Sequence, residues 1–445
     1  AESPSFDDSQ WRKTDLPHDW SIEDLPGTNS PFNINSISQV NGGFTTGGTG
    51  WYRKTFTVPD NLRDKHFIIL FEGVYMNAEV WLNGHYLGNH PYGYSSFWFD
   101  ITDSLKFDGD NVLCVKVKNE GENSRWYSGS GIYRHVWLQV VSSVHTATWG
   151  TYITTQQASE KEALVNIKTT IINESQETRK IKLITKIFDV SSQQISQVET
   201  IQTIEPENNG VLDQEVKLNN PALWSPDVPE LYRAVSEIYE NETLIDQTNT
   251  SFGIRSISYN AETGFSLNGK PIKLKGGCVH HDNGPLGSKA FDRAEERRVE
   301  LLKASGFNAI RCSHNPPSPA FLDACDRLGM LVIDEAFDMW NEQKNPNDYH
   351  IWFNNWWKKD IENMILRDRN HPSVVMWSIG NEIPNRQKPE VVQTAKMLAD
   401  FIRNIDTTRP ITSAVNDLNP DKDPYFATLD IGGYNYASGG DHNQA

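Results

Sequence analysis

The sequence predicts a multidomain β plus α/β protein, in which two all-β domains precede part of an eight-stranded β/α barrel. Three observations support this prediction: short strands with turn residues up to about residue 145, a polar strand-rich segment over 146–256, and a strand–helix alternation over 257–445. A length of 445 residues suits about three domains at roughly 150 residues each. We therefore expect domains at 1–145, 146–256 and 257–445.

The first two segments carry the pattern of antiparallel β-sheets. Asn83-Gly84, between two strand-like runs, is a typical two-residue hairpin turn. Short strands at this spacing predict a sandwich or jelly roll for the first segment, and alternating strands predict an immunoglobulin-like sandwich for the second. The expected strands include 51–58, 67–71, 78–82, 112–117 and 135–140, followed by 163–168 and 182–188.

The third segment alternates strands with helices. Ser318-Pro319 predicts a helix start, with a capping serine before proline in the first turn, and Gly306 and Gly329 predict helix ends. Six β units are expected, which is two strands short of a closed eight-stranded (β/α)8 barrel. The predicted strands are 272–278, 307–311, 331–334, 373–377, 410–414 and 430–434, and the predicted helices are 292–305, 319–328, 352–367 and 389–404.

Polar side chains follow five of these six strands. In a parallel barrel, the carboxyl ends of the strands surround one mouth, so these side chains should converge there. Carboxylates, imidazoles and amides in one cleft can bind hydroxyl groups and move protons, and Glu382 beside Asn381 is the central pair. The strand ends carry His280-His281-Asp282, Arg311 to Asn315, Asp334-Glu335, Asn381-Glu382 and Asn435-Tyr436.

Several of these residues have a second interpretation. Arg311 and Glu335 could form a structural ion pair between neighbouring strands, which could also orient Glu382. We interpret His280 as structural, and His281 and His314 as ligand contacts. Spacing among the histidines does not favour a metal site, so we predict neither a metal nor a cofactor.

Composition excludes some partners. The 58 acidic and 41 basic residues give a net charge of -17, which opposes nucleic-acid binding. The sequence holds no apolar run near the roughly 20 residues that span a bilayer, and the spacing of its four cysteines predicts neither a disulfide framework nor a zinc site. The 14 tryptophans suit stacking on sugars. We expect a carbohydrate partner.

Two long motifs resemble the signatures of glycoside hydrolase family 2. The stretch 368–382, DRNHPSVVMWSIGNE, resembles the acid/base signature, and 308–316 running on to 326–335 resembles the other signature. Shorter motifs at 17–20, 50–54, 80–84 and 130–134 look like the family's sugar-binding jelly roll, and 252–255 looks like the end of its immunoglobulin-like domain. The resemblance therefore covers most of the chain.

The resemblance implies a retaining exo-β-glycosidase, most like the β-galactosidases, that works by double displacement. Glu382 matches the acid/base, and Asn381 matches the residue that holds the sugar 2-hydroxyl. His281, Arg311 and His314 match positions around the sugar, Glu335 a supporting carboxylate, and Tyr436 a tyrosine near the nucleophile. β-Glucuronidase, β-mannosidase and a non-catalytic carbohydrate-binding fragment are the alternatives.

The sequence departs from the family pattern in two ways. Some family members bind magnesium through a Glu-x-His pair after the motif that ends at Glu335, whereas 336–340 is AFDMW here, so we do not carry that metal over. The family nucleophile is a glutamate after the seventh strand, and no residue of this chain matches it. We expect a truncated fragment that is nearly inactive alone. The resemblance suggests a periplasmic or secreted setting without fixing the compartment, and a homo-oligomer is left open.

Overall fold

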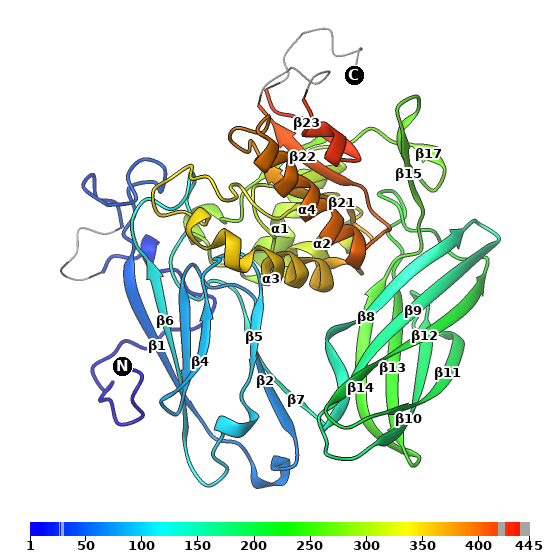
Figure 1. The fold of residues 1–445 in the computed structure, drawn as a ribbon, viewed down its shortest axis with the longest axis horizontal. Helices are drawn as coiled ribbons and strands as arrows, with labels where there is room; N and C mark the ends of the chain where they lie inside the picture. Colours follow the sequence, from blue (N-terminus) through cyan, green and yellow to red (C-terminus); the bar gives the residue numbers. More distant parts are fainter. Residues whose placement is uncertain (26, 28–30, 417–422, 437–445) are drawn as a thin grey trace.

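The first domain is a β-sandwich, seen in a computed structural model that describes residues 1–25, 27, 31–416 and 423–436 (Figure 1). A four-stranded sheet, in the order β1-β6-β3-β4, contains Gly48–Phe56, Asn111–Asn119, Ala78–Leu82 and His85–His90. A three-stranded sheet, in the order β5-β2-β7, contains Phe97–Asp100, His66–Phe71 and Val136–Val141. Asn83 and Gly84 have φ values of 54° and 85°, which confirms the predicted hairpin turn.

The second domain is also a sandwich of two antiparallel sheets. One sheet, in the order β12-β9-β8, contains Asn208–Asn219, Glu162–Asn173 and Val144–Ala158. The other, in the order β11-β10-β13-β14, contains Gln194–Ile204, Arg179–Phe188, Tyr232–Glu240 and Thr243–Phe252. Strand β12 alternates buried and exposed residues along most of its length, as expected of a strand with one wet face. The hairpin strands β15, β16 and β17, at Ile257–Asn260, Gly264–Leu267 and Lys270–Pro271, lead into the third domain.

The third domain contains a six-stranded sheet whose neighbouring strands are parallel and follow one another in chain order. Its strands β18 to β23 are Gly276–Val279, Ala309–Cys312, Leu331–Glu335, Val374–Asn381, Ile411–Val415 and Ile431–Tyr434. Helices α1 to α4 are Asp292–Ala304, Pro319–Leu328, His350–Asp368 and Pro389–Ile405. The prediction of six β units is thus confirmed. The first strand begins later than expected because Ile272 still donates its N–H to Phe265 of the hairpin.

Local capping explains why α2 begins and ends where the sequence predicts. The Ser318 side chain accepts a hydrogen bond from the Phe321 N–H, and Pro319 occupies the first turn. Gly329 closes the helix with φ 70°, a left-handed conformation that costs glycine little. Strand β20 begins two residues after Gly329 and pairs with β19 so that Ala309 lies opposite Leu331.

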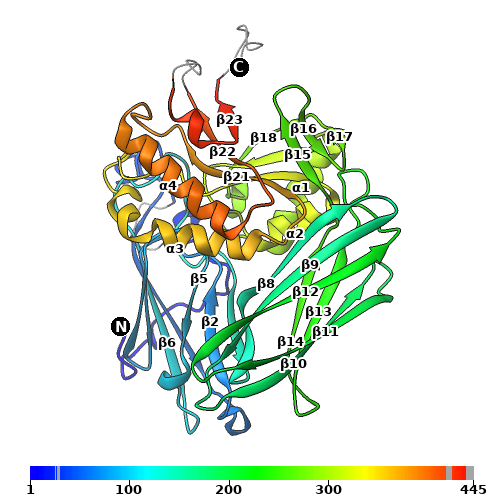
Figure 2. The ribbon, with the colours of Figure 1, turned by 45° about the vertical axis from the view of Figure 1, so that its right-hand side comes forward.

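The third domain lies across both sandwiches in the two ribbon views (Figures 1 and 2). Asp360 of α3 is fully enclosed and accepts hydrogen bonds from His90 and Ser95 of the first domain. Asn370 binds the backbone of Thr151 and Ile153 in the second domain. The 368–382 motif therefore contacts the second domain near its beginning, through Asn370, and ends with Asn381 and Glu382. No helix in the described ranges is long and apolar enough to cross a membrane.

Candidate active site

The carboxyl end of β21 presents Asn381 and Glu382 at the mouth of the six-stranded sheet. All eight residues of β21 are buried, as its uninterrupted apolar run predicts. A Cβ at Gly380 would lie 2.9 Å from the Ile383 side chain, so glycine allows the close packing here. Glu382 leaves the strand with φ 46°, donates its N–H to Ala414 at 2.7 Å, and keeps 9% of its side chain exposed. The backbone of Glu382 is therefore fixed by a hydrogen bond, and part of its side chain remains exposed.

Glu335, at the end of β20, is the centre of a buried ion-pair network. Its carboxylate has no exposed surface and receives two-point hydrogen bonding from Arg311, with the shortest contact at 2.7 Å. His314 Nδ1 lies 2.5 Å from Oε1, and Ser378 donates its hydroxyl to Oε2 at 2.6 Å. Burial raises the pKa of Glu335, but Arg311 and His314 outweigh it and hold that pKa below its usual value. The Glu335 carboxylate therefore binds Arg311, His314 and Ser378 and has no exposed surface of its own.

Arg311 connects the Glu335 ion pair to the Asn381–Glu382 pair by hydrogen bonds. Its Nη2 donates to Asn381 Oδ1 at 2.9 Å, and its Nη1 donates to Asn435 Oδ1 at 3.1 Å. Asn435 in turn donates from Nδ2 to Asn381 Oδ1 at 3.0 Å and to Glu382 Oε1 at 2.7 Å. Arg311 and Glu335 therefore form the predicted ion pair between neighbouring strands, and Asn435 links Arg311 to Glu382.

The first domain contributes a residue that the sequence did not reveal. Arg125 lies between β6 and β7 and binds the Asp338 carboxylate at two points, at 2.6 and 2.8 Å. Its Nη1 also lies 3.8 Å from Glu382 Oε2. Lys344 donates to Asp338 at 2.9 Å and to the Asn381 carbonyl at 2.7 Å. Although burial raises the pKa of Asp338, Arg125 and Lys344 keep it far below its usual value.

The two histidines after β18 have contacts that favour the opposite of our interpretation. His281 is 7% exposed, and its Nε2 donates to the Ser128 carbonyl at 2.9 Å. Burial lowers the pKa of His281 to about 3, so its imidazole stays neutral. His280 is only partly buried and faces Trp126 and His314, with ring centroids 4.9 and 5.7 Å away. His280 therefore borders the mouth, while His281 lies in the domain interface.

Tyr436 follows β23 and is the most exposed of the predicted site residues, with 80% of its surface accessible. Its neighbour Asn435 donates to Glu382 Oε1 at 2.7 Å, and the Glu382 carboxylate raises the pKa of the Tyr436 phenol. Arg311, His314, Glu335, Asn381, Glu382 and Tyr436 are thus gathered at one mouth, and His281 is not part of that contact network.

The mouth offers charged and amide groups rather than a vacant metal site. Asp338, which follows the predicted site strand β20, is already bound by two cationic side chains, so it does not fit a cation. Within the described ranges, two other groups of His, Asp and Glu side chains are close enough to share a metal ion. Neither of those groups contains a residue of the mouth.

Three family models match consecutive parts of the chain. They are described as the sugar binding domain of glycosyl hydrolases family 2 at residues 12–141, glycosyl hydrolases family 2 at 146–255, and the TIM barrel domain of that family at 261–436. These matches agree with the order of two sandwiches and a parallel β/α domain. The chain belongs to glycoside hydrolase family 2.

Individual relatives match nearly the whole chain. A β-galactosidase of Bacteroides ovatus, BoGH2A, is 42% identical across 98% of this chain and 54% of the relative. A putative β-glucuronidase of Formosa agariphila is 38% identical across 98% of this chain and 40% of the relative. A solved family 2 structure from Bacteroides cellulosilyticus is 51% identical with a TM-score of 0.96, covering 98% of this chain and 56% of that one. The chain therefore spans about half the length of the relatives it matches.

Proposed function

We propose that this chain carries the acid/base half of a retaining exo-β-glycosidase that removes terminal β-D-galactosides. The observation that supports the proposal is the Asn381–Glu382 pair, which Arg311 and Asn435 hold at the end of a buried strand. The proposal for galactosides rests on the resemblance to β-galactosidases and on the printed name of a relative at 42% identity.

We propose a distinct task for each member of the pair. In the first step, the Glu382 carboxyl group donates a proton to the departing glycosidic oxygen, and in the second step it takes a proton from water. Asn435 donates to Oε1, and Oε2 lies 3.8 Å from Arg125 Nη1. The Asn381 oxygen accepts from Arg311 and Asn435, and one amide hydrogen goes to Asp338 at 2.9 Å. Its second amide hydrogen remains for the sugar 2-hydroxyl.

Double displacement also needs a second carboxylate about 5 Å from the first, to form the glycosyl–enzyme bond. Two other carboxylates near Glu382 already bind protein side chains. Glu335 has no exposed surface, and Asp338 is held by Arg125 and Lys344. The 445-residue chain alone is therefore proposed to be nearly inactive.

A β-glucuronidase activity is the second candidate. It is supported by the name of the relative that is 38% identical, and by Arg125, a cation at the mouth whose side chain is 33% exposed. Glucuronides carry a carboxylate that such a cation could meet. β-Mannosidase activity and carbohydrate binding without hydrolysis remain as outcomes of the test below.

The test compares nitrophenyl β-galactoside, β-glucuronide and β-mannoside as substrates. Each is supplied to the 445-residue chain and to a longer protein in which the barrel is complete. We expect hydrolysis only by the longer protein, with the galactoside preferred. In that protein, Glu382→Gln should remove hydrolysis of substrates with poor leaving groups, whereas Glu342→Gln, at a nearby surface carboxylate, should not. Preference for another sugar would overturn the galactoside assignment, and strong turnover by the short chain would overturn the proposed inactivity.

A further inference from the structure

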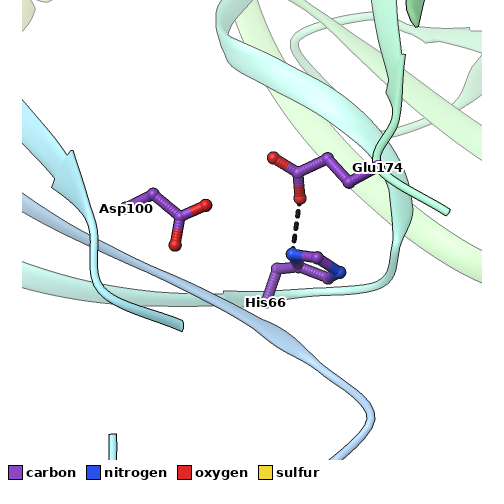
Figure 3. Close-up of side chains that lie close together, drawn as sticks. All are labelled: His66, Asp100 and Glu174. Carbon is purple, nitrogen blue, oxygen red and sulfur yellow. Dashed lines mark ion pairs between the residues drawn. The ribbon is translucent and has the colours of Figure 1, made fainter. Parts of the chain in front are cut away.

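A second cluster of ligand-type side chains lies far from the mouth, where the first two domains meet. His66 begins β2 and Asp100 ends β5, and these strands are paired so that Ile68 lies opposite Asp100. Glu174 follows β9 of the second domain. Each of the three offers one ligand atom, and these atoms all lie within 4.8 Å of one another. Figure 3 shows the three side chains pointing toward a common space.

The charges of this cluster are poorly compensated by protein groups. His66 Nδ1 lies 2.7 Å from Glu174 Oε2, yet that enclosed oxygen accepts no hydrogen bond in the described structure. In the same ranges neither Glu174 nor Asp100 forms an ion pair with a lysine or an arginine, and Lys65 donates to the Ser142 hydroxyl instead. Two carboxylates therefore share one imidazole, and the contact of that imidazole with Glu174 Oε2 lacks hydrogen-bond geometry. A positively charged ligand would offset the negative charge of these carboxylates.

A neighbouring histidine also has an unused ring nitrogen. His145 lies opposite Ile172 in the β8–β9 pairing, and Glu174 follows the end of β9 two residues further on. His145 is 1% exposed, its Nδ1 lies 2.9 Å from the Ser142 carbonyl, and its buried Nε2 has no partner.

We propose that His66, Asp100 and Glu174 bind one divalent transition-metal ion, with Zn²⁺ the best fit, and that this ion fastens the first domain to the second. One imidazole nitrogen and two carboxylate oxygens are zinc ligands at about 2.0–2.2 Å, and water can complete a tetrahedron. Separations below 4.8 Å allow all three atoms to reach one ion after small side-chain movements. Calcium prefers six to eight oxygen ligands, which this mixed set does not supply.

A comparable cluster in the third domain does not share these properties. Asp323, Asp326 and His371 also lie within ligand distance of one another. There, however, Asp326 accepts from the Ser373 N–H at 3.0 Å and contacts His371 Nδ1 at 2.6 Å, so its oxygens already have partners. What distinguishes the interface cluster is the enclosed Glu174 Oε2, whose 2.7 Å contact with His66 Nδ1 lacks hydrogen-bond geometry.

The experiment uses the 445-residue chain, which contains both partner domains, and is independent of glycosidase activity. After treatment with a chelator, Zn²⁺ is titrated by calorimetry, and thermal unfolding is recorded with and without the metal. We expect one tight site per chain and a higher unfolding temperature in zinc. Glu174→Gln and Asp100→Asn, which preserve shape, should each weaken that site at least tenfold. His135→Asn is the matched control, because it removes an imidazole that lies 2.7 Å from a single carboxylate, and it should change nothing.

Two further results bear on the same site. Co²⁺ bound in place of zinc should give a visible absorption spectrum of low coordination number that Glu174→Gln abolishes. Absence of a tight site, zinc binding that survives both carboxylate substitutions, or Ca²⁺ binding tighter than Zn²⁺ would each overturn the proposal.

Discussion

Removal of the Arg125 side chain should loosen the contact between the first domain and the barrel mouth. Arg125 donates two hydrogen bonds to Asp338, whose side chain is only 1% exposed. Hydrogen bonds to a charged group contribute about 1.5–3 kcal/mol each, and breaking a buried pair costs about 3–5 kcal/mol. Because Arg125 is one third exposed and Lys344 remains on Asp338, we expect Arg125→Ala to cost about 2 kcal/mol of unfolding free energy.

A double-mutant cycle isolates this interaction. Arg125→Ala, Asp338→Ala and the double variant are compared by urea unfolding, and the double variant should lose about 2 kcal/mol less than the sum of the single losses. Arg63→Ala is the control, since its 2.8 Å ion pair with Asp60 is exposed and should contribute less than about 1 kcal/mol. Additive losses at Arg125 and Asp338, within about 0.5 kcal/mol, would refute the reasoning.

Two other substitutions test the buried ion pairs of the third domain. Glu335→Gln should cost about 3–5 kcal/mol of unfolding free energy, because it leaves Arg311 without its carboxylate. Ser378→Ala, which removes one hydrogen bond to Glu335, should cost about 1 kcal/mol. Chemical unfolding measures both losses. Asp326 outweighs burial and raises the pKa of His371 to about 9, above roughly 6.5 when unfolded. The pair should therefore stabilise the fold fully below pH 6.5, and the unfolding free energy should fall by about 3 kcal/mol as the pH rises through 9. His371→Asn should remove this fall in unfolding free energy. An equal fall in that variant would contradict the assignment.

The sequence predicted the elements that local chemistry determines. The capping serine at 318 and the left-handed Gly329 mark the ends of α2, and an apolar run marks β21, because each signal lies within a few residues of its effect. Strands β4 and β5 were not predicted. Their sequences, HYLGNH and FWFD, show no sustained alternation, and pairing with β3 and β2 determines their conformation.

The site was only partly predictable, since some of its contacts join distant parts of the chain. Arg125 binds Asp338 across 213 positions, and no periodicity in either segment reveals that pairing. His280 and His281 follow the end of β18, so strand alternation does not say which of the two faces the mouth. Packing of the first domain against His281 decides that question.

The assignment of Glu382 as the acid/base is tested most directly by leaving-group dependence in the longer protein with a complete barrel. Glu382→Ala should slow hydrolysis of a galactoside with a poor leaving group by about 10²–10⁴-fold, while a dinitrophenyl galactoside, which needs little proton donation, should still form the glycosyl–enzyme at nearly the original rate. Added azide should then restore turnover and yield the β-galactosyl azide. Equal losses for both substrates, without rescue by azide, would contradict the account.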